Sequence, residues 1–173
     1  RVPLSTQIVS PADFPLAGVG VGDPVWALPQ SNPGTDTIPF LGIATEELDP
    51  TLWSDITYTL GSVISPSGAG TFAFSQSGGL GLDFYMSSFD PSGTVNGDNT
   101  FVMTPGVHDH ANWMFNEAGL WQVELSVSGV HDTLGFLSDT QTFSFSVVPE
   151  PSTYAAIAGA LALAFVVYRR RRQ

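Results

Sequence analysis

The sequence contains no cysteine and no lysine, and nearly all of its positive charge lies at one end. Without cysteine the chain has no disulfide, no thiolate ligand for a metal and no cysteine nucleophile. The basic residues are Arg1 and the four arginines at 169–172, against 16 carboxylates and a net charge of -11. Between these two ends the chain therefore carries carboxylates, three histidines and no permanent positive charge.

This charge pattern limits the kinds of molecule that can bind the part of the chain before the C-terminal arginines. An acidic surface repels the phosphates of nucleic acids and the anionic headgroups of membranes, so we expect no nucleic acid there. Cations are the natural partners of such a surface. The acidity has two open explanations, which are solubility in a salty setting and a dedicated role in cation binding.

Glycine, proline and phenylalanine are abundant and favour an all-β fold. The chain has 18 Gly, 13 Pro and 12 Phe, and its short apolar runs are bounded by turn residues. Alternating apolar and polar positions predict about eight strands, at 25–28, 56–64, 71–75, 82–86, 100–104, 111–115, 121–127 and 140–148. We therefore predict one immunoglobulin-like β-sandwich over residues 1–148, with irregular structure and one or two edge strands within 18–50.

The first residues lack the features of a natural amino terminus. The chain opens with Arg1-Val-Pro-Leu and not with Met, and no apolar signal-peptide core lies before residue 14. We expect that processing or fragmentation has removed the amino terminus, and any signal peptide with it.

An uncharged apolar run near the carboxyl end differs from everything before it. Residues 154–167 read YAAIAGALALAFVV, and a positive cluster follows, Arg169, Arg170, Arg171 and Arg172. As a helix the run reaches a little over about 20 Å, and long arginine side chains extend its reach toward bilayer thickness. We predict a transmembrane helix at 154–168. Arginine clusters stay in the cytoplasm, so the carboxyl end is expected inside and the β domain outside.

A sorting motif directly precedes this run. Pro149, Glu150 and Pro151 complete a three-part pattern of a Pro-Glu-Pro motif, an apolar stretch and an arginine cluster. In this order and spacing, residues 148–173 resemble the PEP-CTERM sorting signal of Gram-negative bacteria, which makes 149–173 a separate tail. The resemblance implies processing by an exosortase, a membrane-embedded transpeptidase-like enzyme. It also implies residence in the inner membrane during sorting, and at the cell surface or outside the cell afterwards.

The segment around His108 and His110 holds the densest group of candidate ligands. Residues two apart in an extended chain point to the same side, so the two imidazoles are expected together, a spacing suited to Zn²⁺ or a similar ion such as Mn²⁺. A third ligand has to come from elsewhere, and the candidates are His131, Asp132, Asp109 and Glu117. The competing interpretation is a pair of histidines that face solvent or bind the backbone on a polar strand edge.

Residues just after the histidines have the pattern of core and turn positions. Trp113 and Phe115 alternate as large aromatic residues after Asn112, which predicts a structural role inside the domain. Gly119 precedes a strand and is predicted to be a hairpin glycine that permits a positive φ.

The same segment supports a second resemblance. His108, His110, Asn112-Trp113, Phe115 and Gly119 are followed by Ser138-Asp139-Thr140 and a Phe-rich strand. This succession resembles the choice-of-anchor M domain, related to the actinobacterial surface-anchored repeat, over residues 24–148. The resemblance implies a displayed domain that tolerates different anchors. Relatives on Gram-positive walls occur beside ABC transporter components, which suggests a metal or substrate relay. Family members carry further upstream His and Asp residues, so a site that uses them would be incomplete here.

The sequence contains no recognisable catalytic motif. There is no Gly-x-Ser-x-Gly elbow, no His-Glu-x-x-His motif and no phosphate loop, and Glu46-Glu47 would face opposite ways on a strand. The loop 90–99 is rich in oxygen ligands but lacks the register of an EF-hand, which makes Ca²⁺ less favoured than Zn²⁺ or Mn²⁺.

These observations favour a non-catalytic protein that an exosortase sorts to the envelope or the extracellular matrix. The alternative is a metal-binding or substrate-relay module that uses the His-x-His motif, and an enzyme is a distant third. The expected partners are the exosortase, the membrane through the C-terminal helix and, outside the cell, extracellular polysaccharide or metal-uptake components.

Overall fold

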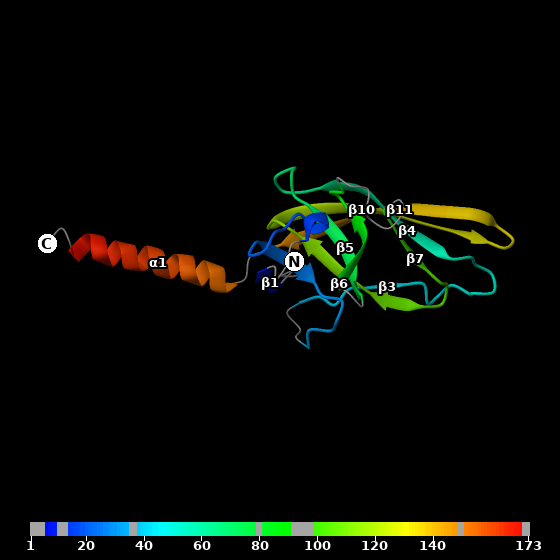
Figure 1. Ribbon diagram of the computed structural model, residues 1–173, viewed down its shortest axis with the longest axis horizontal. Helices are drawn as coiled ribbons and strands as arrows, with labels where there is room; N and C mark the ends of the chain where they lie inside the picture. Colours follow the sequence, from blue (N-terminus) through cyan, green and yellow to red (C-terminus); the bar gives the residue numbers. More distant parts are fainter. Residues whose placement is uncertain are drawn as a thin grey trace.

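The computed structural model describes residues 6–9, 14–34, 38–78, 81–90, 99–148 and 151–170. Its strands lie together in one β region, and helix α1 (Pro151–Arg170) extends away from it (Figure 1). Several predicted features lie outside the described residues, namely most of the loop 90–99, Pro149, Glu150, Arg171 and Arg172.

The described strands form three antiparallel sheets. The five-stranded sheet has the order β1-β2-β9-β5-β6, with bounds Thr6–Val9, Pro24–Leu28, Asn112–Phe115, Phe72–Gly78 and Gly81–Ser87. The four-stranded sheet has the order β11-β10-β4-β7, with bounds Gly135–Val147, Gly119–His131, Ile56–Ile64 and Thr100–Met103. A third sheet pairs β3 (Gly42–Ala44) with β8 (His108–His110), and a short 3-10 helix, η1, covers Pro15–Ala17. The prediction of an all-β domain is confirmed for the described residues before α1, and its sheets are antiparallel.

Local sequence explains where these strands begin and end. β4 has the predicted bounds, and Ile56, Tyr58 and Leu60 all contribute to the interior, as alternation requires. The turn 65–70 then ends the strand. The Ser65 hydroxyl accepts a hydrogen bond from the Gly70 amide at 2.8 Å, a local bond typical of serine in turns. This turn carries the chain from the four-stranded sheet to β5 in the five-stranded sheet.

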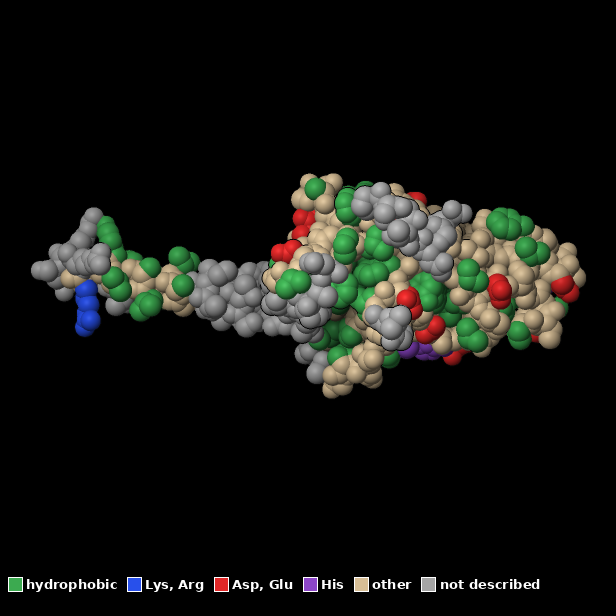
Figure 2. Space-filling model, viewed as in Figure 1, with side chains coloured by type: hydrophobic (Ala, Val, Ile, Leu, Met, Phe, Trp, Pro, Cys, Tyr) green, Lys and Arg blue, Asp and Glu red, His purple; other side chains and the backbone are tan. Residues whose placement is uncertain are grey.

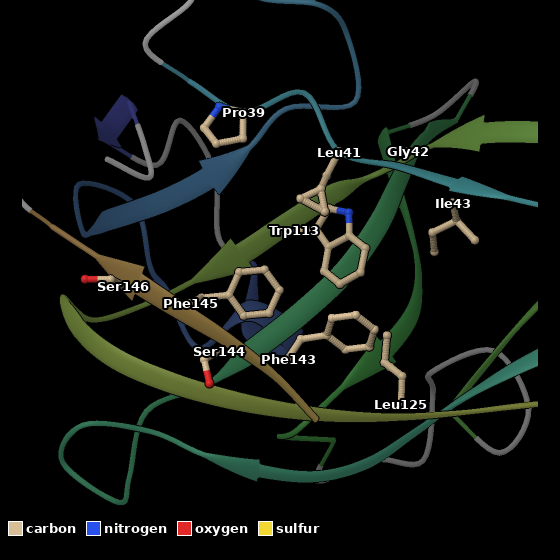
Figure 3. Close-up of a pocket in the computed structure, with 10 residues that line it drawn as sticks. All are labelled: Pro39, Leu41, Gly42, Ile43, Trp113, Leu125, Phe143, Ser144, Phe145 and Ser146. Carbon is tan, nitrogen blue, oxygen red and sulfur yellow. The ribbon is translucent and has the colours of Figure 1, made fainter. Parts of the chain in front are cut away.

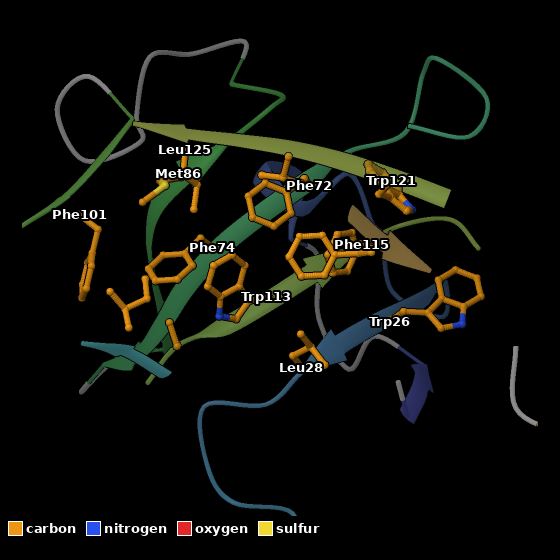
Figure 4. Close-up of a cluster of buried hydrophobic side chains, with 14 of the residues drawn as sticks. Trp26, Leu28, Phe72, Phe74, Met86, Phe101, Trp113, Phe115, Trp121 and Leu125 are labelled. Carbon is orange, nitrogen blue, oxygen red and sulfur yellow. The ribbon is translucent and has the colours of Figure 1, made fainter. Parts of the chain in front are cut away.

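The two larger sheets share one core dominated by aromatic side chains (Figure 4). Phe74 and Trp113 enter it from the five-stranded sheet, and Trp121 and Phe145 from the four-stranded sheet. Trp113 is 4% exposed, and its ring lies edge-on to Phe74 with 5.1 Å between centroids. Such ring pairs contribute about 0.5–1.5 kcal/mol beyond the burial of their area. The predicted core role of Trp113 agrees with this position.

Asn112 fastens the start of β9 to two neighbouring segments. Its Oδ1 accepts a hydrogen bond from the Gln30 amide at 3.0 Å, and its Nδ2 donates to the Ser75 carbonyl at 3.4 Å. Gln30 follows β2 and Ser75 lies in β5, so the two bonds connect both neighbours of β9 to its first residue. Asn112 therefore has a structural task, as its place in the sequence suggests.

Gly119 has the positive φ expected of it, but it is not a hairpin glycine. Its φ is +137°, and β9 and β10 on either side of it belong to different sheets. The glycine therefore lies where the chain crosses between the sheets. A Cβ at this position would lie 2.5 Å from Pro66 Cγ, so the close approach of the turn 65–70 also requires glycine.

Helix α1 covers the predicted transmembrane segment and ends with Arg169 and Arg170 in its last turn. All of its described side chains, at 158–165 and 167–170, are exposed. The transmembrane prediction itself finds no support here: within the part of the chain that the structure describes, no helix combines the length and apolarity needed to cross a membrane.

Candidate functional site

The two predicted ligand histidines lie on β8, which pairs with β3 at the surface. Gly42 is opposite His110 and Ala44 is opposite His108. The buried Thr45 fixes this small sheet to the loop before β8, because its hydroxyl donates to the Thr104 carbonyl at 2.8 Å and its amide donates to the Val107 carbonyl at 2.8 Å. The pair of histidines is therefore held on a short, anchored sheet.

His108 and His110 point to the same side, as their spacing predicts. Their Nε2 atoms are 2.8 Å apart, and the ring centroids are 4.6 Å apart. Gly42 makes room for them, because a Cβ there would lie 2.6 Å from the Nε2 atom of His108. The extended backbone of β8 puts both rings on one side of the strand, and the absence of a side chain at Gly42 lets their Nε2 atoms approach each other.

The other nitrogen of each ring faces an oxygen. His110 Nδ1 lies 3.1 Å from the Leu41 carbonyl, which can only accept, so this nitrogen carries the hydrogen. His108 Nδ1 lies 3.5 Å from the Glu46 carboxylate, which favours a hydrogen there too. With both Nδ1 atoms as donors, neutral rings direct two Nε2 lone pairs at each other. A proton or a metal cation between them relieves that repulsion.

The surroundings favour a positive charge at this point. Phe40 stacks on His110 with 3.6 Å between ring centroids and 10° between planes, which restricts the ring and leaves its edge free. The histidine side chains that are visible in the space-filling view have acidic side chains beside them (Figure 2). In the described part of the domain, 14–34, 38–78, 81–90 and 99–148, no Lys or Arg competes with a bound cation.

None of the four predicted third ligands joins the pair. His131 lies at the far end of β10, where its Nδ1 is 3.1 Å from Asp132 and its ring is edge-on to Trp53. Asp109 accepts a hydrogen bond from the His110 amide at 2.7 Å, and Glu117 binds Ser67. Among the described residues, no group of three or more His, Cys, Asp or Glu side chains is arranged to hold a metal ion.

The structure adds partners that sequence reasoning did not assign. Glu46, Leu41 and Phe40 all contact the histidines, yet they lie more than sixty residues away in the sequence. The sequence places Glu46 only in a carboxylate pair with Glu47. The sequence signals for this region were the expected edge strands within 18–50 and the family resemblance over 24–148, and neither specifies the pairing of β3 with β8. No family model, curated protein or solved structure matches the chain.

Proposed function

We propose that the protein is a non-catalytic envelope protein whose tail directs sorting by an exosortase. The observation that carries this proposal is the exposed apolar surface of α1. Leu161, Leu163 and Phe165 are each more than 60% exposed on a helix that begins at the last residue of the Pro-Glu-Pro motif and has arginines in its last turn. Large apolar side chains without a protein partner need another apolar environment, and a bilayer supplies it.

In this proposal the tail enters the inner membrane with its arginines in the cytoplasm, and the exosortase acts near the motif. The β domain is then displayed outside, in the envelope or the extracellular matrix. An immunoglobulin-like sandwich suits that task. In support, β4 pairs with β7 in one sheet and β5 with β9 in the other, like the B–E and C–F pairs of that fold. A departure is β10, which lies beside β4 instead of β9.

The sorting proposal is tested by expressing the full chain behind a cleavable signal peptide in a Gram-negative host that contains an exosortase. We expect a processed form that is absent from an exosortase-deficient strain. Replacing Pro149, Glu150 and Pro151 by alanine should abolish processing and leave the unprocessed chain in the membrane fraction. Deleting residues 154–173 should release the protein into the soluble fraction instead.

The two variants separate sorting from anchoring. A processed band of normal mass from the motif variant would contradict the role of the Pro-Glu-Pro motif. Membrane retention of the deletion variant would contradict the role of the apolar run. Changing Glu47 to Gln, an exposed carboxylate in the β domain, is the matched control and should change neither fractionation nor processing.

A second candidate function, binding of a divalent transition metal, is favoured by the convergence of the two Nε2 atoms. In a tetrahedral zinc site with bonds of about 2.0–2.1 Å, two ligand nitrogens lie about 3.3 Å apart. Small rotations of the two rings bridge the difference from 2.8 Å. His108 and His110 would hold the ion, while Leu41 and Glu46 keep the hydrogens on Nδ1. Water would supply the remaining positions, so modest affinity is expected.

Calorimetric titration of Zn²⁺ and Mn²⁺ into the full chain tests this candidate. Replacing either His108 or His110 by alanine should remove the binding, because one imidazole remains. His131→Ala is the matched control and should bind like the unchanged protein, since His131 lies at the far end of β10. Equal binding by all variants would contradict the site.

Glu46 offers a more sensitive test of the same site. Its carboxylate orients His108 and does not touch the facing Nε2 atoms, so Glu46→Gln should weaken metal binding about tenfold and not abolish it. Acidic pH should weaken binding in every competent variant, because protons compete for the same nitrogens. Unchanged affinity in the Gln variant would show that Glu46 has no orienting role.

A further inference from the structure

Strand β11 is the longest edge strand of the described sheets. It is the last strand of the four-stranded sheet and, among the described strands, it pairs only with β10. It has 13 residues, whereas the other edge strands of the two larger sheets, β1, β6 and β7, have 4, 7 and 4. Natural edge strands are often short or carry lysine or proline, which discourage the addition of a further strand. β11 contains neither lysine nor proline.

Alternate backbone groups of β11 point to its open edge, the side that faces away from β10. Ser126 lies opposite Thr140, and their hydroxyl oxygens are 2.8 Å apart, which fits the close approach of a pair without mutual backbone bonds. The Thr140 amide accordingly donates to the Asp139 carboxylate at 2.8 Å, on the open edge. By alternation, the backbone groups on this edge belong to Phe136, Ser138, Thr140, Thr142, Ser144 and Ser146.

A pocket with a cavity volume of about 540 Å³ lies beside this edge, between β11 and the segment 39–43. Figure 3 shows the Phe143 and Phe145 rings on the side of β11 that faces Trp113. The Ser144 hydroxyl points to the other side, so this serine lines the pocket through its backbone (Figure 3). The pocket therefore reaches the open backbone edge of β11, and its lining is uncharged and mostly apolar.

The inner face of β11 is apolar at two exposed positions and acidic between them. Leu137 and Phe143 are 40% and 48% exposed, so the five-stranded sheet leaves both partly uncovered. Asp139 lies between them and, by alternation, on the same face. The described β domain contains no Lys or Arg that could pair with this carboxylate. A strand added to the edge would bury the two apolar side chains and place one of its own side chains opposite Asp139.

These features select an extended, positively charged peptide as the occupant of the edge. A row of backbone donors and acceptors is matched by the backbone of another strand, while pockets beside the edge select its side chains. A second copy of the β domain matches the backbone but brings the same carboxylates, and the net charge of -11 opposes its approach. A peptide that carries Lys or Arg complements Asp139 instead.

We infer that β11 binds an extended peptide, which adds to the four-stranded sheet as a fifth, antiparallel strand. Apolar side chains of the peptide enter the pocket beside Phe143 and Phe145. A Lys or Arg lies opposite Asp139, four residues after the peptide residue that faces Phe143, because side chains alternate along a strand. Binding here requires neither a metal nor the sorting tail.

The probe is the peptide TLTLTTTKT, acetylated and amidated at its ends and titrated by calorimetry into the full chain in neutral detergent. In the antiparallel register its two leucines lie opposite Phe145 and Phe143, and its lysine lies opposite Asp139. A peptide with glutamate in place of lysine should bind about tenfold more weakly. The peptide LTLTTTTKT, whose leucines lie on the outer face, should also bind about tenfold more weakly. Equal affinities for the three peptides would overturn the assigned chemistry of the partner.

Amide hydrogen exchange of the ¹⁵N-labelled full chain, followed by nuclear magnetic resonance, tests the backbone pairing. The lysine peptide should slow the exchange of the Ser138, Thr142 and Ser144 amides about tenfold or more. The Gln141 and Phe143 amides already face β10 and should change little. The absence of this alternation at saturating peptide would overturn strand addition. Slow exchange of the same three amides without peptide, and only at high protein concentration, would show that a second copy occupies the edge, which would also overturn the inference.

Thr142→Pro and Thr142→Ala are a matched pair of variants that locates the site. Proline removes one N–H from the open edge and no bond to β10, so it should weaken binding of the lysine peptide about tenfold or more. Alanine keeps that N–H and should leave the dissociation constant within about twofold. Phe143→Ala leaves the backbone unchanged, removes a partly exposed wall of the pocket and should weaken binding about fivefold. Unchanged affinity in either the folded proline variant or Phe143→Ala would overturn the location.

Discussion

The two ends of the β10–β11 ribbon have the same backbone pairing and opposite surroundings. At one end Trp121, Val123 and Phe145 are buried in the core, while at the other Val130 and Phe136 are exposed. The first end faces the five-stranded sheet, and its strand β10 also pairs with β4. The far end, from residue 129, lies beyond the pairing with β4, and its neighbour there is the segment 52–54, which contacts β10 through a bridge between Trp53 and His131 and a hydrogen bond from the Ser54 amide to the Val130 carbonyl.

This comparison shows that an apolar residue in a strand is a core residue only where a second layer covers it. Phe136 and Phe145 have the same side chain on the same strand, yet Phe136 is 68% exposed and Phe145 is 8% exposed. The free energy of unfolding should therefore depend strongly on substitutions at the covered end and weakly on those at the far end.

Trp121→Ala should have the largest effect. The side chain is fully buried, stacks edge-on to Phe115 with 5.2 Å between centroids, and donates its N–H to the Glu117 carbonyl. Removal of a buried tryptophan lowers the free energy of unfolding by about 3–5 kcal/mol. Denaturant melts of the variant and the unchanged protein measure the difference. A loss under about 1 kcal/mol would mean that the covered end is not the stabilising one.

Gly119→Ala should come next, and Gly135→Ala is its counterpart at the far end. Both glycines have a positive φ, +137° and +76°, but only Gly119 has a neighbour, Pro66, in the space a Cβ would occupy. We expect a loss of about 2–3 kcal/mol at Gly119, where strain and a clash combine, and about 1 kcal/mol at Gly135. If denaturant melts show equal losses for the two variants, the clash with Pro66 does not add to the cost at Gly119.

Near the covered end, Glu117 should make the free energy of unfolding depend on pH. Burial raises the pKa of Glu117, but hydrogen bonds from the Ser67 amide and hydroxyl, and from Ser65, bring it below its usual value. A lowered pKa means that this stabilisation is complete above the unfolded-state value of about 4.3 and is lost as pH falls through the folded-state value.

Glu117→Gln should thus cost about 0.5–1 kcal/mol at neutral pH, a small effect because the side chain is largely accessible to solvent. The difference between the two proteins should shrink below about pH 4.3. Thermal melts across this range measure it. A constant difference at all pH values would contradict the role of the charged form. Asp139→Asn, an exposed carboxylate at the middle of β11, is the control.

Much of the fold follows from the sequence because alternation marks strands that face a core. The bounds of β4 were predicted, while β10 and β11 are longer than the predicted 121–127 and 140–148. Their extra residues enclose a tight turn that ends at Gly135. Such a segment, with serine, glycine and aspartate, has the composition of a loop. Its strands are held by backbone pairing with each other and by hydrogen bonds to the segment 52–54, which no local pattern predicts.

The candidate sites were less predictable because they depend on distant contacts. The spacing of His108 and His110 predicted their common face, since alternation is a local property. Glu46 and Leu41 come to them through the pairing of β3 with β8, which no spacing rule determines.

The smallest effect is expected from Phe136→Ala at the far end. The ring is 68% exposed, and the backbone pairing of β11 with β10 remains, so the free energy of unfolding should change by at most about 0.5 kcal/mol. Denaturant melts at two protein concentrations, tenfold apart, are the measurement. A loss above about 1 kcal/mol at both concentrations would mean that the ring packs within its own chain, against the exposure described above. A loss that appears only at the higher concentration would mean that a second copy covers the ribbon, because only an intermolecular contact depends on concentration. Either result would mean that the far end is also covered, so the two ends would not differ as described. No loss at either concentration would support the five-stranded sheet as the reason that only the covered end is sensitive to substitution.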